Sequence, residues 1–325
     1  MASVLEVQDL HVSYLSREGT ELQALAGAGF ALQQGEILGV LGESGSGKST
    51  LAAALVKLLP PSGRVTKGVV LFEGQDLLQS TSQELRRIRG ARMALIFQEP
   101  SLALHPTMRV GEQVRQVLAA HSPACNDALR ERTQEAFAML FSGDADRVSR
   151  SYPHQLSGGQ RQRVLIAQAI ACHPSVIIAD EPTASLDPTT QMEILGVFRT
   201  LQKKLGLAMI FITHNPALLA GFADRVLVLY GGRVIECGPA EAVLASPQHP
   251  YTKALFQSIP ADLEYGGNAC KTKLPAIPGD AFSLPQEGCS FEPRCTERMD
   301  TCQERKPALV NFTATHRVSC FRCEK

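Results

Sequence analysis

The stretch that decides the fold is GESGSGKS, at residues 42–49. It fits the pattern G-x-x-x-x-G-K-[ST], in which a glycine-rich loop wraps its backbone N–H groups around a phosphate. An apolar run at residues 36–41 leads into this loop, and a second apolar run at residues 51–59 follows it. Because strand, loop and helix signals occur in the required order, we predict a phosphate-binding loop and not a chance glycine-rich turn.

Each residue type in this loop has a physical task. The glycines allow the backbone to turn sharply, and the helix that follows adds partial positive charge at its N-terminus. Lys48 supplies a full positive charge to the β- and γ-phosphates, and the Ser49 hydroxyl is placed to coordinate Mg²⁺. The predicted nucleotide-binding residues here are Gly42, Ser44, Gly45, Ser46, Gly47, Lys48, Ser49 and Thr50.

Two adjacent carboxylates, Asp180 and Glu181, follow the apolar run at residues 176–179. Burying carboxylates is costly unless something uses them, and α/β sheets place ligands at the carboxyl ends of their strands. Beside a phosphate loop, Asp180 fits the protein ligand of Mg²⁺. Glu181 then lies one residue further on, where it can polarise the attacking water. The alternative is a strand that ends in two solvated acids.

A third motif narrows the class of nucleotide-binding protein. Residues 156–160 read LSGGQ and precede a predicted helix at residues 161–170. Two glycines that open a helix make a second anion-binding terminus, with an ordinary serine cap as the alternative. Here the sequence resembles the ATPase subunits of ABC transporters. The resemblance implies that this signature closes on the γ-phosphate of ATP held by a second subunit. Its residues are Leu156, Ser157, Gly158, Gly159 and Gln160.

The same resemblance implies roles for residues elsewhere in the chain. Tyr14 stands where the family stacks an aromatic ring on adenine, with a packed strand aromatic as the alternative. Asp187 matches the D-loop. Gln98 matches the glutamine that contacts Mg²⁺ and water, and His214 the histidine that contacts the γ-phosphate. The implied catalytic residues are Glu181, His214, Gln98 and Lys48, and the implied Mg²⁺ ligands are Ser49, Gln98 and Asp180.

The order of strand-like and helical runs predicts an α/β fold over residues 3–260. Residues 110–170 are rich in helix formers and are interpreted as a helical insertion. The resemblance implies a P-loop ABC ATPase domain with a RecA-like parallel sheet, an antiparallel β subdomain and a helical subdomain. Proline and glycine become frequent from about residue 247. We therefore predict a small cysteine-rich C-terminal extension at residues 261–325.

Two segments resemble the branch of this family that imports dipeptides and oligopeptides. They are IFQEPSLALHP at residues 96–106 and SPQHPYTKAL at residues 246–255. His105 and Asn215 depart from the residues common in that branch, so the transported solute stays open among dipeptides, oligopeptides, nickel and other small solutes. The implied partners are two integral membrane permeases, an extracytoplasmic solute-binding protein, and a second ATPase subunit that is either a paralogue or another copy.

Six of the nine cysteines lie between Cys270 and the C-terminus. In a reducing cytosol such crowding predicts metal ligation before disulfides. The spacing C-x5-C-x6-C-x17-C is similar to the cysteine motif of peptide-importer ATPases, which implies a [4Fe–4S] cluster. Its implied ligands are Cys289, Cys295, Cys302 and Cys320. Zn²⁺ bound by four thiolates is one alternative, Cys323 as the fourth ligand another, and no metal a third.

Composition excludes several other classes. The chain has 32 basic and 32 acidic residues, so its net charge gives no argument for nucleic acid as a partner. No apolar run approaches the roughly 20 residues of a membrane span, and residues 1–9 do not resemble a signal peptide. We expect a peripheral protein at the cytoplasmic face of the inner membrane, held there by its permeases. A non-transport ABC ATPase, acting in DNA repair or on the ribosome, is the alternative.

Overall fold

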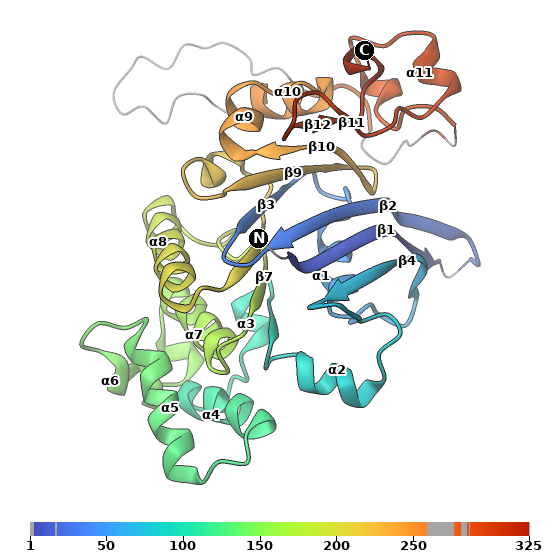
Figure 1. Cartoon of the computed structure of the whole chain (residues 1–325). Helices are drawn as coiled ribbons and strands as arrows, with labels where there is room; N and C mark the ends of the chain where they lie inside the picture. Colours follow the sequence, from blue (N-terminus) through green and yellow to red (C-terminus); the bar gives the residue numbers. More distant parts are fainter. Residues whose placement is uncertain (1–2, 17, 259–275, 281–284, 286, 325) are drawn as a thin grey trace, which may run out of the picture.

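The structure is a computed structural model, and it describes residues 3–16, 18–258, 276–280, 285 and 287–324 (Figure 1). Its strands are β1 (Ser3–Leu15), β2 (Glu21–Gln33), β3 (Ile37–Leu41), β4 (Gly63–Phe72), β5 (Gln75–Asp76), β6 (Met93–Ile96), β7 (Val176–Asp180), β8 (Ala208–Ile212), β9 (Arg225–Tyr230), β10 (Arg233–Pro239), β11 (Val310–Asn311) and β12 (Arg317–Val318). Over the described residues these strands form two sheets, in the orders β2-β1-β4-β5 and β11-β12-β10-β9-β3-β8-β7-β6.

The larger sheet has a parallel centre. β3 pairs in parallel with β8 and β9, and β7 pairs in parallel with β6 and β8. Every residue of β3 and of β8 is buried, as expected for apolar strands covered on both faces. Because parallel strands point the same way, the chain segments that follow β3, β6, β7 and β8 leave the sheet at one edge. That edge carries the site described below.

The smaller sheet is antiparallel and packs beside α1 (Lys48–Leu55). Leu5, Leu10 and Leu25 from its strands share one hydrophobic cluster with Leu51 and Leu55 of that helix. The helix after the phosphate loop is therefore held between the two sheets. This arrangement fixes the direction in which its N-terminus points.

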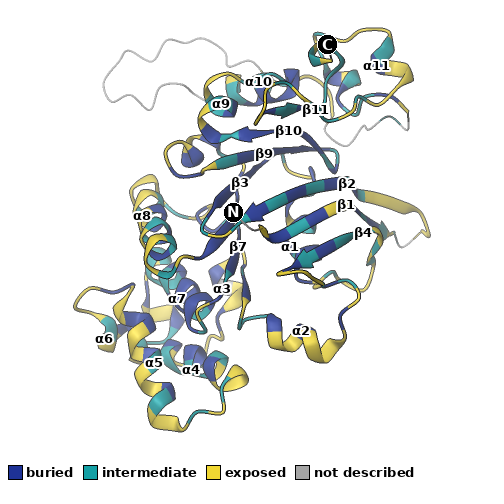
Figure 2. Ribbon diagram, viewed as in Figure 1, coloured by how far each residue is buried: buried dark blue, intermediate teal, exposed yellow. Residues whose placement is uncertain are grey.

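The remaining helices gather mostly at one end of the molecule and over one side of the larger sheet (Figure 1). They are α2 (Ser82–Ile88), α3 (Pro100–Ala103), α4 (Val110–His121), α5 (Asn126–Ala138), α6 (Ala145–Arg150), α7 (Gly158–Ile170), α8 (Pro188–Leu205), α9 (Ala240–Ala245), α10 (Pro250–Gln257) and α11 (Thr301–Glu304). Short 3₁₀ turns lie at Pro153–Gln155, Pro216–Leu219, Glu292–Arg294 and Phe321–Cys323. α4 to α7 form the predicted helical insertion, and Figure 2 shows the outer sides of α2, α5 and α6 exposed.

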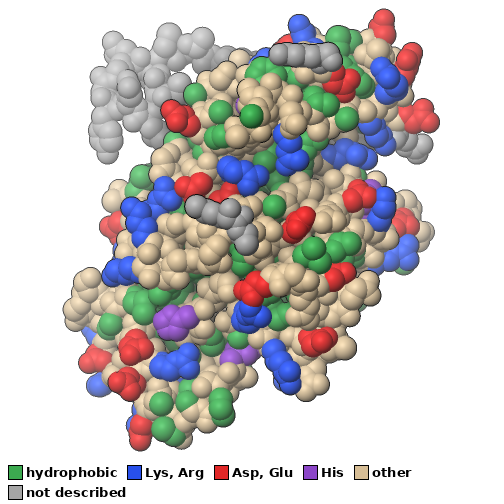
Figure 3. Space-filling view, viewed as in Figure 1, with side chains coloured by type: hydrophobic (Ala, Val, Ile, Leu, Met, Phe, Trp, Pro, Cys, Tyr) green, Lys and Arg blue, Asp and Glu red, His purple; other side chains and the backbone are tan. Residues whose placement is uncertain are grey.

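A helix that spans a membrane requires about 20 predominantly apolar residues. In the part of the chain that the structure describes, no helix is long and apolar enough to cross a bilayer. Basic and acidic side chains are interspersed over the face drawn in Figure 3. This mixture agrees with the balanced charge of the sequence.

The C-terminal segment, of which the structure describes residues 276–280, 285 and 287–324, joins the larger sheet. β11 and β12 pair with each other, and β12 pairs antiparallel with β10, so that Val318 lies opposite Glu236. Glu236 is fully buried and accepts hydrogen bonds from the backbone of Gln248 and of His249, while His316 Nε2 lies 2.8 Å from its Oε1. A buried carboxylate with this many partners ties α10 and the C-terminal hairpin to β10.

The predicted [4Fe–4S] cluster is wrong. Among the described residues, no three His, Cys, Asp or Glu side chains are grouped so that they can hold a metal ion. Cys302 is buried, and Cys289 and Cys295 pack against the hydrophobic core. Burial raises the pKa of Cys289 to about 11 and also raises the pKa values of Cys295, Cys320 and Cys323.

Candidate nucleotide-binding site

The phosphate loop connects β3 to α1 and depends on glycine at two positions. Gly47 has φ of +104°, and a Cβ there would lie 2.6 Å from the carbonyl oxygen of Ala24. A Cβ on Gly42 would lie 2.4 Å from the carbonyl oxygen of Leu229. Neither contact tolerates a side chain, because the atoms involved are backbone. The loop is therefore packed against β2 and β9 in a conformation that only glycine permits.

A cavity of about 680 Å³ opens over this loop. It has the size of pockets that hold small-molecule ligands. Its lining includes these predicted residues: Gly42, Ser44, Gly45, Gly47, Lys48, Ser49, Thr50, Gln98, Glu181 and His214. Ser46 is a buried residue of the loop that does not line the cavity, and its Oγ has no hydrogen-bond partner among the described residues.

Glu181 is the centre of the polar groups in this cavity. Gln98 Nε2 donates to Glu181 Oε2 over 3.3 Å, and His214 Nδ1 lies 3.0 Å from the same oxygen. Lys48 Nζ lies 4.0 Å from Glu181 Oε1. Gln98, Glu181 and His214 follow β6, β7 and β8, so the shared edge of the parallel sheet brings them together. Glu181 also has φ of +46°, a strained conformation of the kind that concentrates at functional sites.

Asp180 has the properties expected of a residue that coordinates Mg²⁺. Its Oδ1 is buried and has no hydrogen-bond partner among the described residues. Burial raises the pKa of Asp180, and the Ser49 hydroxyl opposes that rise by hydrogen bonding to the carboxylate. An unpaired carboxylate oxygen beside a hydroxyl is a donor set that Mg²⁺ prefers. Ser49 and Gln98 line the cavity, whereas Asp180 does not, and the amide of Gln98 offers a further oxygen donor.

Lys48 is buried at the floor of the loop. Its Nζ donates to the carbonyl oxygens of Gly42, at 2.8 Å, and of Glu43, at 2.9 Å. Burial lowers the pKa of Lys48, and the charges of Glu181, Asp180 and Glu43 act in the opposite direction. An ammonium held by carbonyls beside oriented N–H groups is a strong site for a phosphate anion.

The chain as a whole is similar to known transport ATPases. The sequence model of the ABC transporter family matches residues 25–184, and that of the oligopeptide/dipeptide transporter C-terminal region matches residues 235–302. The dipeptide transport ATP-binding protein DppD of Bacillus subtilis (strain 168) is 42% identical over 322 residues, which cover 99% of this chain and 95% of that protein. The chain belongs to the ATP-binding subunits of this transporter family.

Other relatives and solved structures support the same family. The oligopeptide transport ATP-binding protein OppD of Escherichia coli (strain K12) is 40% identical, over 98% of this chain and 93% of its own length. Among solved structures, the dimeric ABC transporter cassette MJ0796 matches with a TM-score of 0.64 at 29% identity, over 73% of this chain and 98% of that one. The cbiO1 protein of Clostridium perfringens matches with a TM-score of 0.65 at 31% identity, over 76% and 92%. The predicted ABC ATPase fold is confirmed.

The signature and the D-loop lie away from the cavity of this ABC ATPase. Ser157 caps α7 in a capping box: its Oγ accepts from Gln160 N–H over 3.2 Å, and Gln160 Oε1 accepts from Ser157 N–H over 3.1 Å. Asp187 caps α8 and accepts from Thr190 N–H over 3.0 Å, and its hydrogen bond to the Thr190 hydroxyl lowers the pKa of Asp187. No signature residue lines the cavity. Their role at a second subunit's nucleotide stays a prediction.

Tyr14 lies beside the loop helix and outside the cavity lining. Its Oη is 3.2 Å from Thr50 Oγ1, and its ring lies close to Gly63 on β4. It packs against the cluster shared by the two sheets. Its stacking on adenine stays a prediction.

Sequence reasoning missed the residues that reach the site from α10 and beyond. Leu255 and Ser258 line the cavity, and the Tyr251 hydroxyl accepts a hydrogen bond from Glu43 N–H over 2.8 Å. The His-Pro-Tyr-Thr element at residues 249–252 is visible in the sequence, but its local pattern does not indicate which part of the fold it contacts. The structure shows that Tyr251 of this element contacts the phosphate loop.

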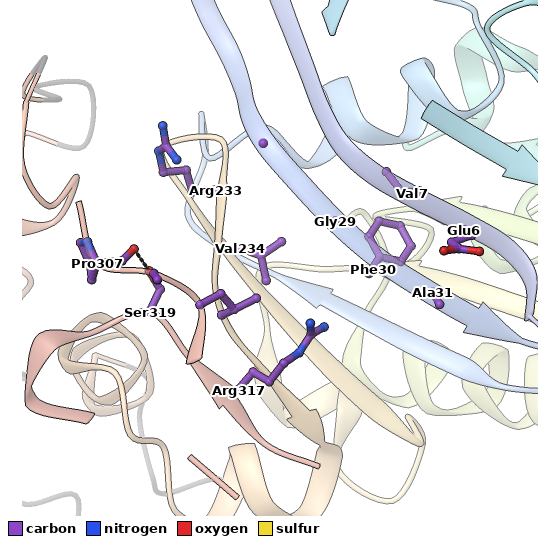
Figure 4. A pocket seen from close by; sticks show the side chains of 13 residues that line it. Glu6, Val7, Gly29, Phe30, Ala31, Arg233, Val234, Pro307, Arg317 and Ser319 are labelled. Atoms are coloured by element: carbon purple, nitrogen blue, oxygen red, sulfur yellow. Dashed lines mark hydrogen bonds between the residues drawn. The ribbon is translucent and has the colours of Figure 1, made fainter. Parts of the chain in front are cut away.

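A second cavity, of about 570 Å³, lies elsewhere on the molecule. Figure 4 shows Glu6 and Phe30 on the side of the smaller sheet, opposite Arg233 of β10 and Arg317 of β12. None of the predicted site residues lines it. It is therefore distinct from the nucleotide-binding cavity.

Proposed function

We propose that this chain is the ATP-hydrolysing subunit of an importer for dipeptides, oligopeptides or related small solutes. One observation carries the proposal: Lys48, Gln98, Glu181 and His214 meet in one cavity, while the signature of the same chain lies outside it. A complete set of reacting groups that lacks its own signature needs a second subunit. The relatives named above are transport proteins, which favours transport over DNA repair or ribosome function.

The chemistry follows from these side chains. The loop N–H groups and Lys48 bind the phosphates, and Glu181 accepts a proton from the attacking water. His214, 3.0 Å from Glu181, orients that carboxylate and contacts the γ-phosphate. Ser49, Gln98 and Asp180 would hold Mg²⁺, which neutralises charge on the phosphate oxygens when bound. Positioning and charge neutralisation supply the rate enhancement, because phosphoryl transfer asks for little covalent chemistry from the protein.

The proposed assembly contains two permeases, a solute-binding protein outside the membrane, and a second ATPase subunit that is a paralogue or another copy. This chain would lie at the cytoplasmic face of the inner membrane, attached through the permeases. Within it, the proposed division is an ATPase domain at residues 3–260 and a C-terminal extension at residues 261–325. The extension is small and cysteine-rich, and its described part is held by packing and hydrogen bonds.

Glu181→Gln tests the proposal. The amide keeps the shape of the side chain but cannot take a proton, so turnover should fall by at least about a hundredfold while ATP still binds. ATP hydrolysis and binding of a fluorescent ATP analogue should be measured on the assembled importer. Glu193→Gln is a matched control, because Glu193 is an exposed carboxylate paired with Arg163. Wild-type turnover in Glu181→Gln would refute the assignment of the base.

A further inference from the structure

The C-terminal segment touches the phosphate loop through an ion pair. Arg294 Nη1 donates to Glu43 Oε2 over 2.7 Å, and Arg294 Nη2 donates to Glu43 Oε1 over 3.2 Å. The two nitrogens of one guanidinium thus contact the two oxygens of one carboxylate, the geometry that makes such pairs strong. The side chain of Arg294 is 5% exposed and that of Glu43 is 24% exposed, so water screens this pair less than it screens a pair on the surface. The two residues are 251 positions apart in the chain.

Arg294 is itself fixed in place. Its Nε donates to the carbonyl oxygen of Pro278 over 2.8 Å, and its guanidinium carbon lies 5.8 Å from the centre of the Tyr230 ring. Phe291, three residues earlier, packs edge-on against the rings of Tyr230 and Tyr251. A guanidinium held on two sides by the C-terminal segment and β9 has little freedom to leave the loop.

Every polar group of Glu43 has a partner. Its N–H donates to Tyr251 Oη, its carbonyl oxygen accepts from Lys48 Nζ, and its carboxylate accepts from Arg294. Tyr251 is fully buried. One residue therefore connects the C-terminal segment to the lysine that binds phosphate. The loop pattern leaves position 43 free to be any residue type, so the pattern itself does not explain a carboxylate there.

A carboxylate that lines this cavity repels a triphosphate unless another charge neutralises it. Arg294 supplies that charge from behind the loop. We propose that Arg294 is a positioning residue for ATP binding: it neutralises Glu43 so that this carboxylate does not repel the triphosphate, while Tyr251 holds the Glu43 N–H of the loop backbone. The inference rests on the proposed function only in that the cavity binds ATP. It assigns to the C-terminal segment a direct influence on nucleotide affinity.

The test compares ATP affinity across a charge-removal cycle in the full-length chain with Mg²⁺ present. Arg294→Gln leaves Glu43 unneutralised and should raise the Kd for ATP by about tenfold. The double variant Glu43→Gln/Arg294→Gln removes both charges and should return the Kd to within about threefold of wild type. Arg294→Lys keeps the positive charge, so its Kd for ATP should lie between those of wild type and Arg294→Gln. Arg298→Gln is the control, because Arg298 belongs to the same segment but pairs on the surface with Glu292.

The outcomes separate the possible failures. If wild type does not bind ATP, the proposed function fails. If wild type binds and Arg294→Gln binds equally well, the positioning role is overturned. The positioning role is also overturned if Arg294→Gln loses ATP affinity and the double variant does not recover it, since Arg294 then acts through packing alone. Thermal melting shows whether each variant is folded. If Arg294→Gln does not fold, Glu43→Gln alone decides: it should bind ATP at least as tightly as wild type, and weaker binding contradicts the proposal.

Discussion

The phosphate loop and the C-terminal segment meet at Glu43, yet they are held in opposite ways. The contacts of the loop are mostly with backbone: Lys48 donates to the carbonyl oxygens of Gly42 and Glu43, and two loop glycines lie against carbonyl oxygens of β2 and β9. The C-terminal segment is held by side chains that pair with distant residues, such as Phe291 against Tyr230 and His316 against Glu236. Substitutions in the loop should therefore mainly change ATP binding and hydrolysis. Substitutions in the C-terminal segment should mainly change the free energy of unfolding.

Phe291→Ala should produce the largest loss of stability. Phe291 is 2% exposed and belongs to the core cluster, so its removal should cost about 3–5 kcal/mol in the free energy of unfolding. Urea denaturation measures this loss. Phe321→Ala is the matched control: Phe321 is partly exposed under the Arg305 guanidinium and should cost about 1 kcal/mol. Equal losses for the two variants would show that the segment is not anchored through Phe291.

Lys48→Met should weaken ATP binding without lowering the stability of the fold, the reverse of Phe291→Ala. Removing the ammonium deletes the charged hydrogen bonds to phosphate, so the Kd for ATP should rise by about a hundredfold. Stability without nucleotide should not fall, because burial already penalises the charged form of Lys48. Titration calorimetry and thermal melting on the same preparation check both statements. A large drop in melting temperature would mean that Lys48 holds the fold, which would erase the contrast between the two regions.

The same contrast explains what could be predicted from the sequence. The loop was predictable because its glycines, lysine and serine stand at fixed spacing within residues 42–49. The meeting of Gln98, Glu181 and His214 was predictable because each follows a parallel strand. The contact of Arg294 with Glu43 was not, because no local pattern links residues 251 positions apart.

The cysteines give a second case in which a local sequence pattern did not predict the structure. Their spacing resembles that of a metal site, but spacing does not say which way a thiol points or how deeply it is buried. Cys289 and Cys295 pack against apolar neighbours, and burial raises their pKa values. The prediction failed because spacing along the chain does not say whether the side chains are grouped so that they can hold a metal ion, and among the described residues no such group is found.

His249 should make the C-terminal attachment sensitive to acid. Burial lowers its pKa to about 3, and its Nδ1 accepts from Tyr251 N–H over 3.0 Å. Below the ordinary value of 6.5 the unfolded chain binds the proton and the folded chain does not. Stability should therefore fall as the pH drops from 6.5 towards 3, by up to about 1.4 kcal/mol per pH unit.

Urea denaturation of wild type and His249→Asn between pH 7 and pH 5 isolates this effect. Asn offers an amide oxygen to Tyr251 N–H but does not titrate, so the variant should be less stable at pH 7 and lose stability less steeply below it. Parallel curves for the two proteins would rule out His249 as the source. Lys253, whose charge also disfavours a protonated His249, is unchanged in both proteins.

Ser157→Ala should give the smallest change in stability, and it tests a residue outside both regions. Loss of the cap on α7 should cost about 1 kcal/mol. Thr81→Ala is the matched control, because Thr81 makes the same capping box with Glu84 on α2. Both variants should lose similar stability, and neither should change ATP affinity, since neither residue lines the cavity. If the signature acts on a second subunit's nucleotide, only Ser157→Ala should also slow hydrolysis in the assembled importer. Equal hydrolysis rates for the two variants would limit Ser157 to capping its own helix.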